Sequence, residues 1–167
     1  MKNLIKLLFV GIVLCPLIGT AVSCSEEEDC SMNARMMLNC TFYSFNPETQ
    51  VVKKDTIDSL TITAYGTDSI ILNNQKSVVN LSLPLRYSTN TTQLVFRYSR
   101  NKADTVTIGH NNVPYFLSID CGYQMQQTVT EVQHTNHQLD SIYVSSNEAN
   151  LFNRENLKLF SVWKKKR

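Results

Sequence analysis

The most constraining feature of this sequence is a series of short segments in which apolar and polar residues alternate. Residues 59–66, for example, place Leu60 and Ile62 on one side of an extended chain and Thr61 and Thr63 on the other. This period of two is typical of strands with one buried face. Asparagine-rich turn signals separate such segments at intervals of about ten residues, which indicates an all-β sandwich or barrel. We therefore predict an immunoglobulin-like antiparallel β-sandwich over residues 34–163.

Individual segments add detail to this prediction. Residues 92–99 would bury Leu94, Phe96 and Tyr98 together on one face of a strand. Residues 78–87 also alternate, but Pro84 within them favours an edge strand or a bulge, because proline has no amide hydrogen to donate.

Two further segments bear on the connections between strands. A turn at Asn111 and Asn112 is expected to separate a strand at 104–110 from another at 115–120. Residues 147–160 are the one place where a helical turn competes with a strand.

The first 23 residues have the organisation of an export signal. The basic start "MKNLIK" precedes the apolar stretch "LLFVGIVLCPLIG". That stretch is shorter than the roughly 20 residues that a membrane-spanning helix needs, so we predict a signal peptide at 1–23. Without Lys2 and Lys6, the rest of the chain carries 14 basic and 14 acidic residues. This neutral balance gives no support for nucleic-acid binding.

The end of this segment predicts a lipid anchor. "TAVSC" resembles the lipobox of bacterial lipoproteins, in which the peptidase cuts before a cysteine that carries acyl chains, so Cys24 is the predicted lipidation site. An ordinary secretory cleavage that leaves Cys24 free for a disulfide is the alternative. The following residues resemble the serine-plus-acids export signal of surface lipoproteins in Bacteroidota: Ser25, Glu26, Glu27, Glu28 and Asp29. A plain solvated linker is the alternative for these residues, which belong to a predicted lipidated acidic tether at 24–33. The basic run at 164–167 is predicted to be a solvated tail.

Three cysteines remain after the signal peptide and the anchor, namely Cys30, Cys40 and Cys121. An exported compartment permits disulfides, and three thiols allow one bond. We predict Cys30–Cys121, which would join the start of the domain to the end of a central strand, with Cys40–Cys121 as the alternative. No histidine or cysteine pairs at zinc-like spacing accompany them, so neither a metal nor another cofactor is expected.

An Asp–Ser/Thr–aliphatic tripeptide occurs five times. Its hydroxyl residues are Thr56, Ser59, Ser69, Thr105 and Ser141. Aspartate in the turn before a strand explains the pattern structurally. Because the tripeptide also resembles an O-glycosylation acceptor of exported Bacteroidota proteins, these five residues are candidate glycan sites.

Residues for catalysis are scarce in this sequence. His134 and His137 lie three apart on a predicted strand and turn, so they would point to opposite faces, and His137 with Asp140 would form at most half of a dyad. We therefore expect all three histidines, His110, His134 and His137, to lie at the surface, and we expect no enzyme. An exposed aromatic platform for glycans is a further interpretation, and its candidates are Tyr65, Tyr87, Tyr98, Tyr123 and Trp163.

Several blocks together resemble a family of small uncharacterised Bacteroidota lipoproteins with a domain of unknown function. They are "DSLTITAYGTDSIIL", "LSLPLRY", "TQLVFRYS", "YFLSIDCG", "HTNHQLDSI" and "ENLKLF", and the resemblance spans roughly residues 24 to 161. It implies an exported location and a cysteine near the N-terminus matched to Cys121. It implies no activity and no catalytic residue.

The combined expectation is a lipid-anchored protein of the outer membrane, facing the cell surface, with the periplasmic face as the alternative. Its expected role is a non-catalytic binding or assembly module with a protein partner in an envelope complex. An enzyme acting on envelope glycans or peptides is one alternative, and a structural lipoprotein without a specific ligand is the other.

Overall fold

The computed structural model describes residues 35–67, 69–98, 102–119, 121–149 and 154–162. All regular structure in these residues is β-strand. The strands are β1 (Met37–Asn46), β2 (Val51–Lys54), β3 (Ile57–Ala64), β4 (Ile70–Val78), β5 (Asn80–Pro84), β6 (Thr91–Tyr98), β7 (Ala103–Ser118), β8 (Gly122–His134), β9 (Leu139–Val144) and β10 (Leu157–Ser161).

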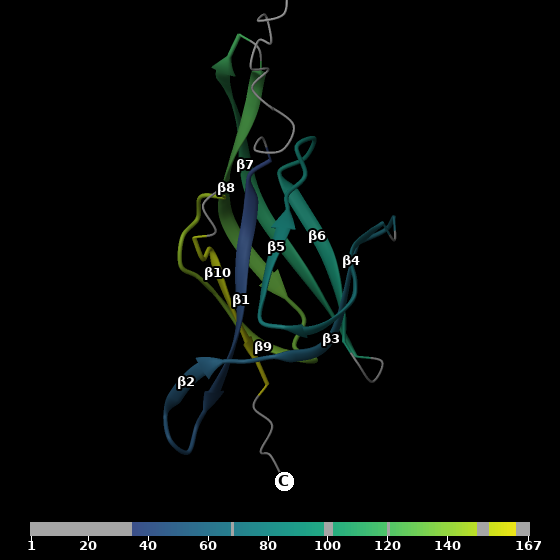
Figure 1. Ribbon diagram of the computed structural model, residues 1–167, viewed down its shortest axis with the longest axis vertical. Helices are drawn as coiled ribbons and strands as arrows, with labels where there is room; N and C mark the ends of the chain where they lie inside the picture. Colours follow the sequence, from purple (N-terminus) through teal and green to yellow (C-terminus); the bar gives the residue numbers. More distant parts are fainter. Residues whose placement is uncertain (1–34, 68, 99–101, 120, 150–153, 163–167) are drawn as a thin grey trace, which may run out of the picture.

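Two five-stranded sheets form the sandwich (Figure 1), which confirms the predicted all-β sandwich fold. The first sheet has the order β2-β1-β10-β9, with β5 paired to β1, and the second has the order β4-β3-β6-β7-β8. Neighbouring strands are antiparallel except β1 and β10, which pair in parallel. Strands β5 and β2 share one edge of β1, because β5 pairs with residues 37–41 and β2 with residues 43–46.

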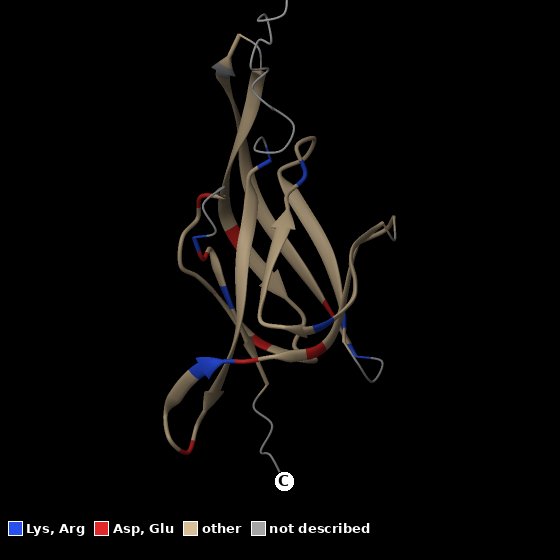
Figure 2. Ribbon diagram, in the orientation of Figure 1, with Lys and Arg blue, Asp and Glu red and all other residues tan. Residues whose placement is uncertain are grey.

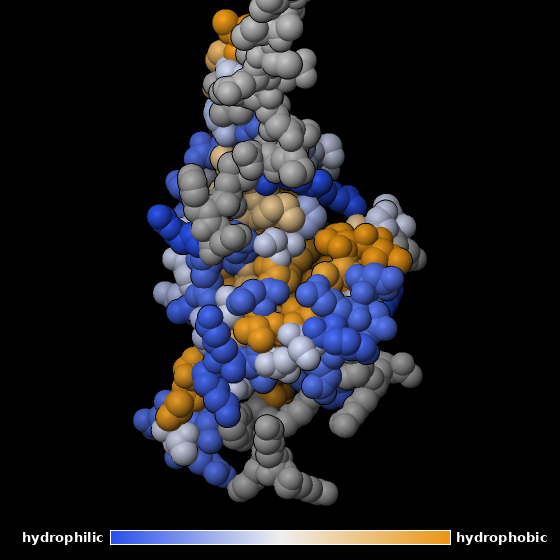
Figure 3. All heavy atoms as spheres, viewed as in Figure 1, coloured by the Kyte–Doolittle hydropathy of each residue, from blue (hydrophilic) through white to orange (hydrophobic). Residues whose placement is uncertain are grey.

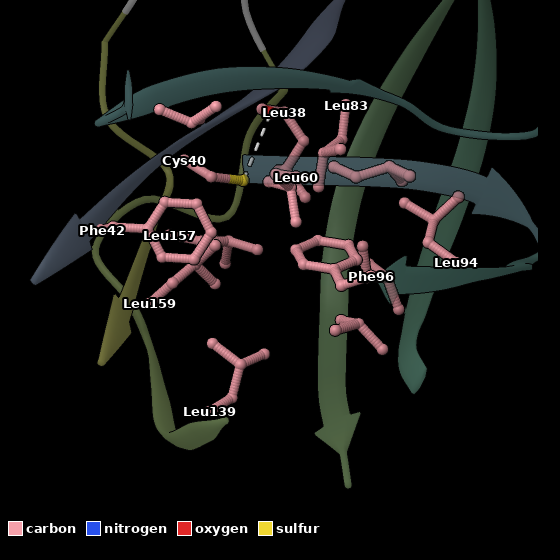
Figure 4. Close-up of a cluster of buried hydrophobic side chains, with 14 of the residues drawn as sticks. Leu38, Cys40, Phe42, Leu60, Leu83, Leu94, Phe96, Leu139, Leu157 and Leu159 are labelled. Carbon is pink, nitrogen blue, oxygen red and sulfur yellow. Dashed lines mark hydrogen bonds between the residues drawn. The ribbon is translucent and has the colours of Figure 1, made fainter. Parts of the chain in front are cut away.

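The core lies between the sheets and consists mainly of leucine, isoleucine and phenylalanine. Leu94, Phe96 and Tyr98 are all buried, as the alternation of β6 predicts. Figure 4 shows Phe96 of the second sheet and Phe42 of the first among the buried leucines. Burying an aliphatic or aromatic side chain of this size contributes about 1.5–3 kcal/mol, so this layer is the main source of stability.

The predicted edge position of Pro84 is also confirmed. Within the described residues, β5 pairs with β1 alone, and Pro84 lies opposite Met37 at the end of the ladder. A proline is tolerated at this position because no further strand requires its missing amide hydrogen.

Three details differ from the prediction. Asn111 and Asn112 do not form a turn, because residues 103–118 make one long strand, β7, with a register shift between Gly109 and His110. Strand β2 was not predicted, since its four residues are all exposed and lack alternation. In the alternation of β3, Thr63 is buried instead of exposed, because the pairing with β4 shifts register between Leu60 and Thr63.

The predictions for the two ends of the chain and for a helical turn at 147–160 fall wholly or partly outside the described residues. The described strands run from Met37 to Ser161, and the predicted signal peptide, acidic tether and basic tail lie outside the described residues. Residues 150–153, in the middle of the segment where a helical turn competed, also lie outside. No helix long and apolar enough to cross a membrane occurs among the residues that were described.

Candidate interaction surfaces

The outward side of the first sheet carries an unusual number of aromatic side chains, and we call it the aromatic face. It is formed by Tyr43 and Phe45 of β1, Phe160 of β10 and Tyr143 of β9. Cross-strand pairing places Tyr43 opposite Phe160, with ring centroids 5.8 Å apart. The solvent-facing side of such a sheet is usually polar, so four aromatic residues here need an explanation beyond folding.

A lysine lies between the tyrosines of this face. The Nζ atom of Lys158 is 5.7 Å from the ring centroid of Tyr43 and 6.0 Å from that of Tyr143. Both distances are within the range of a cation–π contact. Tyr143 is 61% exposed, so its ring remains available to a partner.

Glu155 completes the face. Its Oε2 atom accepts a hydrogen bond of 2.8 Å from the Tyr43 hydroxyl, and its Oε1 atom is 3.8 Å from Lys158 Nζ. The hydrogen bond to Glu155 raises the pKa of Tyr43, so the phenol stays a donor. Rings with an ordered acid and base among them suit the core of a protein or glycan contact, where aromatic residues supply area and polar groups supply orientation.

A second surface is the arm, which we define as residues 111–119 and 121–127 at the far ends of β7 and β8. Strand β6 pairs with β7 only as far as Gly109, whereas β7 and β8 stay paired up to Ser118 and Gly122. Figure 1 shows the two strands continuing beyond the rest of the sandwich as a ribbon. A two-stranded ribbon is marginally stable alone, so its persistence depends on support at the base and the tip.

One face of the arm is apolar. Phe116 and Tyr123 are paired across the strands with ring centroids 5.5 Å apart in an edge-to-face geometry, and Pro114 pairs with Met125 on the same side. Phe116 is 56% exposed and Tyr123 is 76% exposed. The opposite face is more polar and includes a hydrogen bond of 3.0 Å from the Tyr115 hydroxyl to Gln124.

The arm carries no basic residue, and its tip is apolar. In Figure 2 no blue or red residue lies on the arm. The one charged residue in this part of the sequence is Asp120, which lies between the two described segments of the arm. Ile119 is 91% exposed, and Figure 3 shows apolar atoms at this end of the molecule. The turn is fixed by a 3.0 Å hydrogen bond from the Cys121 amide to Ser118 Oγ and by Gly122, whose φ of 66° favours glycine.

The base of the arm is built from the side-chain amides of Asn112, which is half-buried, and Gln127. The Nδ2 group of Asn112 donates to the carbonyl oxygens of Arg86, Tyr87 and Thr89, at 3.2, 3.2 and 2.8 Å. Gln127, which is fully buried, donates to Arg86 O at 3.1 Å and to Asn112 Oδ1 at 2.8 Å. These bonds hold the β5–β6 loop against the point where the arm leaves the sheet.

His110 belongs to the same network. Its Nδ1 atom lies 3.0 Å from Asn112 Oδ1, and its Nε2 atom lies 2.8 Å from the hydroxyl of Thr92, which itself accepts from the Arg86 amide. Since Asn112 Oδ1 can only accept, the ring donates through Nδ1 and accepts at Nε2. Burial lowers the pKa of His110, which favours this neutral form. This histidine is therefore a buried structural residue, and the expectation of a surface position is wrong for it.

Comparison with known proteins gives one match. The sequence model of a family of unknown function (DUF6452) matches residues 59–161. The chain belongs to this family. No curated protein and no solved structure matches the chain. The DUF6452 match runs from the third residue of β3 to the end of β10. It includes the whole arm and the Tyr143, Lys158 and Phe160 side of the aromatic face.

The buried carboxylate of Asp104, in the DUF6452 region, takes the place of Asp140 as the partner of the candidate catalytic residue His137. Asp104 is fully buried and accepts backbone hydrogen bonds from His137, Gln138 and Leu139, at 2.7, 2.8 and 2.9 Å. The Thr135 hydroxyl donates to it at 3.0 Å. Burial by itself would raise the pKa of Asp104, but these hydrogen bonds outweigh it and hold the pKa below its ordinary value.

His137 pairs with this aspartate. Its Nδ1 atom is 3.2 Å from Asp104 Oδ1, and its side chain is 64% exposed. His134 instead has its Nδ1 atom 3.1 Å from Thr135 O. The described residues contain no group of three or more metal-ligating side chains.

The predicted cysteine and tether residues are tested in part. Cys24, residues 25–29 and Cys30 lie outside the described residues. Cys40 is a free, buried thiol, so the alternative pairing Cys40–Cys121 is wrong. Cys121, at the tip of the arm, is disulfide-bonded, and its partner is not among the described residues.

The five Asp–Ser/Thr sites fall into two groups. Thr56, Ser69 and Ser141 are exposed, while Ser59 and Thr105 are half-buried. The tripeptide at Thr105 begins with the buried Asp104, so its aspartate is committed to the fold. At Thr56, Asp55 accepts a hydrogen bond of 2.9 Å from the Thr56 amide and another from the Ser161 hydroxyl. Asp55 precedes β3, as the structural explanation of the pattern requires, whereas Asp104 is the second residue of β7.

The predicted aromatic platform does not assemble from its five candidates. Tyr98 is buried, Trp163 lies outside the described residues, and Tyr65, Tyr87 and Tyr123 are exposed on separate elements. The aromatic face uses other residues. Tyr43 and Tyr143 come from segments a hundred residues apart, and their strands β1 and β9 are brought together because both pair with β10. Alternation within one strand therefore did not reveal them.

Proposed function

We propose that this protein is an exported, lipid-anchored cell-envelope protein that acts as a non-catalytic binding or assembly module at the outer membrane. The aromatic face is the observation that carries the binding role. Exposed aromatic side chains clustered with an ordered Lys158–Glu155 pair are typical of contact surfaces, where a few aromatic anchors supply most of the affinity. The partner we propose is a protein of the same envelope complex.

The proposed anchor rests on the sequence of the N-terminal segment. Cleavage before Cys24 and acylation of its thiol would tether the chain, and residues 25–29 would direct it to the cell surface. Cys24→Ala should abolish labelling by a radioactive fatty acid, and labelling that persists would move the anchor elsewhere. Neutral replacements of Glu26, Glu27, Glu28 and Asp29 should protect the protein from protease added to intact cells. If protease still removes it, these residues are a linker and not an export signal.

We also propose that Cys30 is the partner of Cys121. Cys15 would leave with the signal peptide and Cys24 would carry lipid, which leaves Cys30 once Cys40 is known to be free. The segment between Cys30 and Arg35 is long enough for Cys30 to reach the tip of the arm. Cys30 precedes Arg35 by five residues, and an extended chain of that length spans up to about 18 Å. From Asn112 to Ser118 the strand advances by six residues, or about 20 Å, and a disulfide adds about 5 Å between Cα atoms.

The binding role is tested by co-purification from native membranes in mild detergent. A stoichiometric protein should accompany the wild type, and Tyr143→Ser should release it. Tyr65→Ser is the matched control, because Tyr65 is also a tyrosine about half-exposed but lies at the end of β3, in the other sheet. Retention of the partner by Tyr143→Ser would remove the aromatic face from the proposal. If no partner is found with any variant, the structural lipoprotein becomes the better interpretation.

An enzyme acting on envelope glycans or peptides is the alternative, and His137 with Asp104 is the pair it would use. Every hydrogen bond described above for the Asp104 carboxylate comes from residues 135–139, and all but the one from the His137 ring come from backbone amides or the Thr135 hydroxyl. This arrangement favours a role for Asp104 in fixing the loop. Hydrolysis of envelope glycans or peptides by the wild type and not by His137→Ala would reverse that assignment.

A further inference from the structure

The starting point is the position at which the chain enters the sandwich. Arg35, the first described residue, donates from Nη2 to Leu85 O at 3.4 Å, and its guanidinium lies 5.4 Å from the Tyr87 ring centroid. The same β5–β6 loop is held by Asn112 and Gln127 at the base of the arm. Figure 1 likewise shows β1 beginning at the end of the sandwich from which the arm projects. The tether and the arm therefore leave the domain at the same end.

The length of the tether limits how far this end can lie from the anchor. Cys24 precedes Arg35 by eleven residues, which span at most about 40 Å when fully extended. If Cys30 is joined to Cys121, the lipidated cysteine precedes the residue bonded to the arm tip by six residues, a distance of at most about 22 Å. A bilayer that holds the acyl chains of Cys24 is thus within reach of the tip.

The chemistry of the tip suits that location. Among its described residues, the exposed apolar side chains are Ile119, Phe116 and Tyr123. No lysine or arginine occurs in the arm, and Asp120 is the acidic residue in its sequence. Aliphatic and aromatic side chains with a phenol hydroxyl are favoured at the boundary between lipid headgroups and acyl chains. In water these residues would leave a projecting apolar surface without a function.

We infer that the arm is a second membrane contact, in which the tip at Ile119 inserts into the interfacial region of the bilayer that holds the Cys24 lipid. This inference rests on the proposed lipid anchor and assigns the arm to the bilayer and the aromatic face to the protein partner. Together the two attachments fix the orientation of the sandwich, with β2 and the β1–β2 hairpin at the end farthest from the membrane. Because the arm has no basic residue, insertion depends on apolar contact and not on anionic lipid, so salt leaves it unchanged.

Tryptophan fluorescence tests this directly. The full chain would be purified from membranes and reconstituted into phosphatidylcholine vesicles with brominated acyl chains, which quench tryptophan only when it lies in the bilayer. Two variants in a Trp163→Phe background are compared, Ile119→Trp at the arm tip and Val52→Trp at the opposite end of the molecule. Both positions are solvent-exposed, so neither change disturbs the core. We expect a blue-shifted emission and severalfold stronger quenching at 119 than at 52, both unchanged by high salt.

The outcomes separate this inference from the proposed anchor. An acylated protein that floats with the vesicles, but whose tryptophan at 119 is neither blue-shifted nor quenched, overturns the inference and leaves the anchor intact. A blue shift without quenching places the tip against protein, either a second copy or another chain, and also overturns it. If mass analysis finds no acyl group at Cys24, the anchor is wrong, and absence of quenching at 119 in the same sample then rejects both.

Discussion

The Oδ2 atom of Asp104 accepts a hydrogen bond of 2.9 Å from the backbone amide of Leu139, 35 residues later in the chain. With the bonds from His137 and Gln138, it makes one carboxylate the acceptor for three successive amides, at the end of the β8–β9 loop and at the first residue of β9. This loop crosses from the second sheet to the first, so Asp104 fixes the position of the two sheets relative to each other at this end.

Asp104→Asn should destabilise the fold strongly. The asparagine amide would turn donor hydrogens toward the donors of Gln138 or Leu139, so we expect the free energy of unfolding to fall by about 2–4 kcal/mol at pH 7. Asp140→Asn, at an exposed position, should change it by less than about 0.5 kcal/mol. Urea unfolding of both variants measures the difference.

The dependence of stability on pH under acidic conditions gives a second test of the role of Asp104. The folded-state pKa of Asp104 is lowered, so its contribution is present above its ordinary value near 3.8 and is lost as the pH falls through the folded pKa. The difference in the free energy of unfolding between wild type and Asp104→Asn should therefore become smaller below pH 3.8. A gap that stays constant down to the lowest pH would mean that the charge of Asp104 is not involved.

His110 should make stability decline on mild acidification. Its folded-state pKa lies below the ordinary value near 6.5, so the unfolded chain binds a proton more readily than the fold. The free energy of unfolding is then highest above that value and decreases as the pH falls from about 7 toward the folded pKa. His110→Gln removes the titrating group, and its melting temperature should depend less on pH between 7.5 and 5.5 than that of the wild type. Equal slopes for the two proteins would mean that His110 does not cause the decline.

Strands β6 and β7 show where prediction from the sequence succeeds and where it fails. In β6, strict alternation around Phe96 is sufficient, because one buried face determines which side chains point inward. In β7, two asparagines looked like a turn, yet the Asn112 side chain bonds to the β5–β6 loop, 23 to 26 residues earlier. A contact at that separation leaves no local pattern, so turn propensity was overridden by tertiary hydrogen bonds.

The motif "ENLKLF" shows the same limit. Asn156 is fully buried, and its Oδ1 atom accepts from the Asn39 amide at 2.9 Å while its Nδ2 group donates to Ser146 O at 3.0 Å. The sequence marks the strand that follows through Leu157 and Leu159, but it cannot show that the polar residue before them connects β1 to the β9–β10 loop. The aromatic face was missed for a related reason, since it needs the pairing of the first and last strands.

The cysteines give a prediction that separates all the disulfide arrangements. Burial raises the pKa of the Cys40 thiol, so an alkylating reagent at pH 8 should not modify it in the folded protein. After unfolding without reductant, Cys40 should be modified while Cys121 is not. Reduction before unfolding should then expose Cys121 together with its partner, and peptide mapping identifies that partner. Recovery of Cys24 instead of Cys30 would refute both the proposed pair and the lipid anchor.

Removal of this disulfide should lower the free energy of unfolding by several kcal/mol. A Cys30–Cys121 bond closes a loop of about 90 residues, and the chain-entropy estimate for such a loop is roughly 4 kcal/mol. Cys121→Ser should lower the free energy of unfolding by up to that amount, whereas Cys40→Ala, which removes a small buried group, should cost about 1–2 kcal/mol. Equal losses in urea unfolding would indicate that the disulfide constrains the unfolded chain little.

Any side chain at Gly109 should destabilise the fold by a steric clash, and a second substitution should relieve that clash. A Cβ atom at this position would lie 2.7 Å from Glu131 Cγ and 3.0 Å from Thr130 Oγ1, at the register shift where β7 begins to leave β6. Gly109→Ala should therefore lower the free energy of unfolding by about 1–3 kcal/mol through overpacking. Glu131→Ala removes the closer atom, so the double variant should be more stable than the sum of the two single changes predicts. The coupling is measured by a double-mutant cycle in urea, and additive effects would show that the backbone at this bulge moves apart easily.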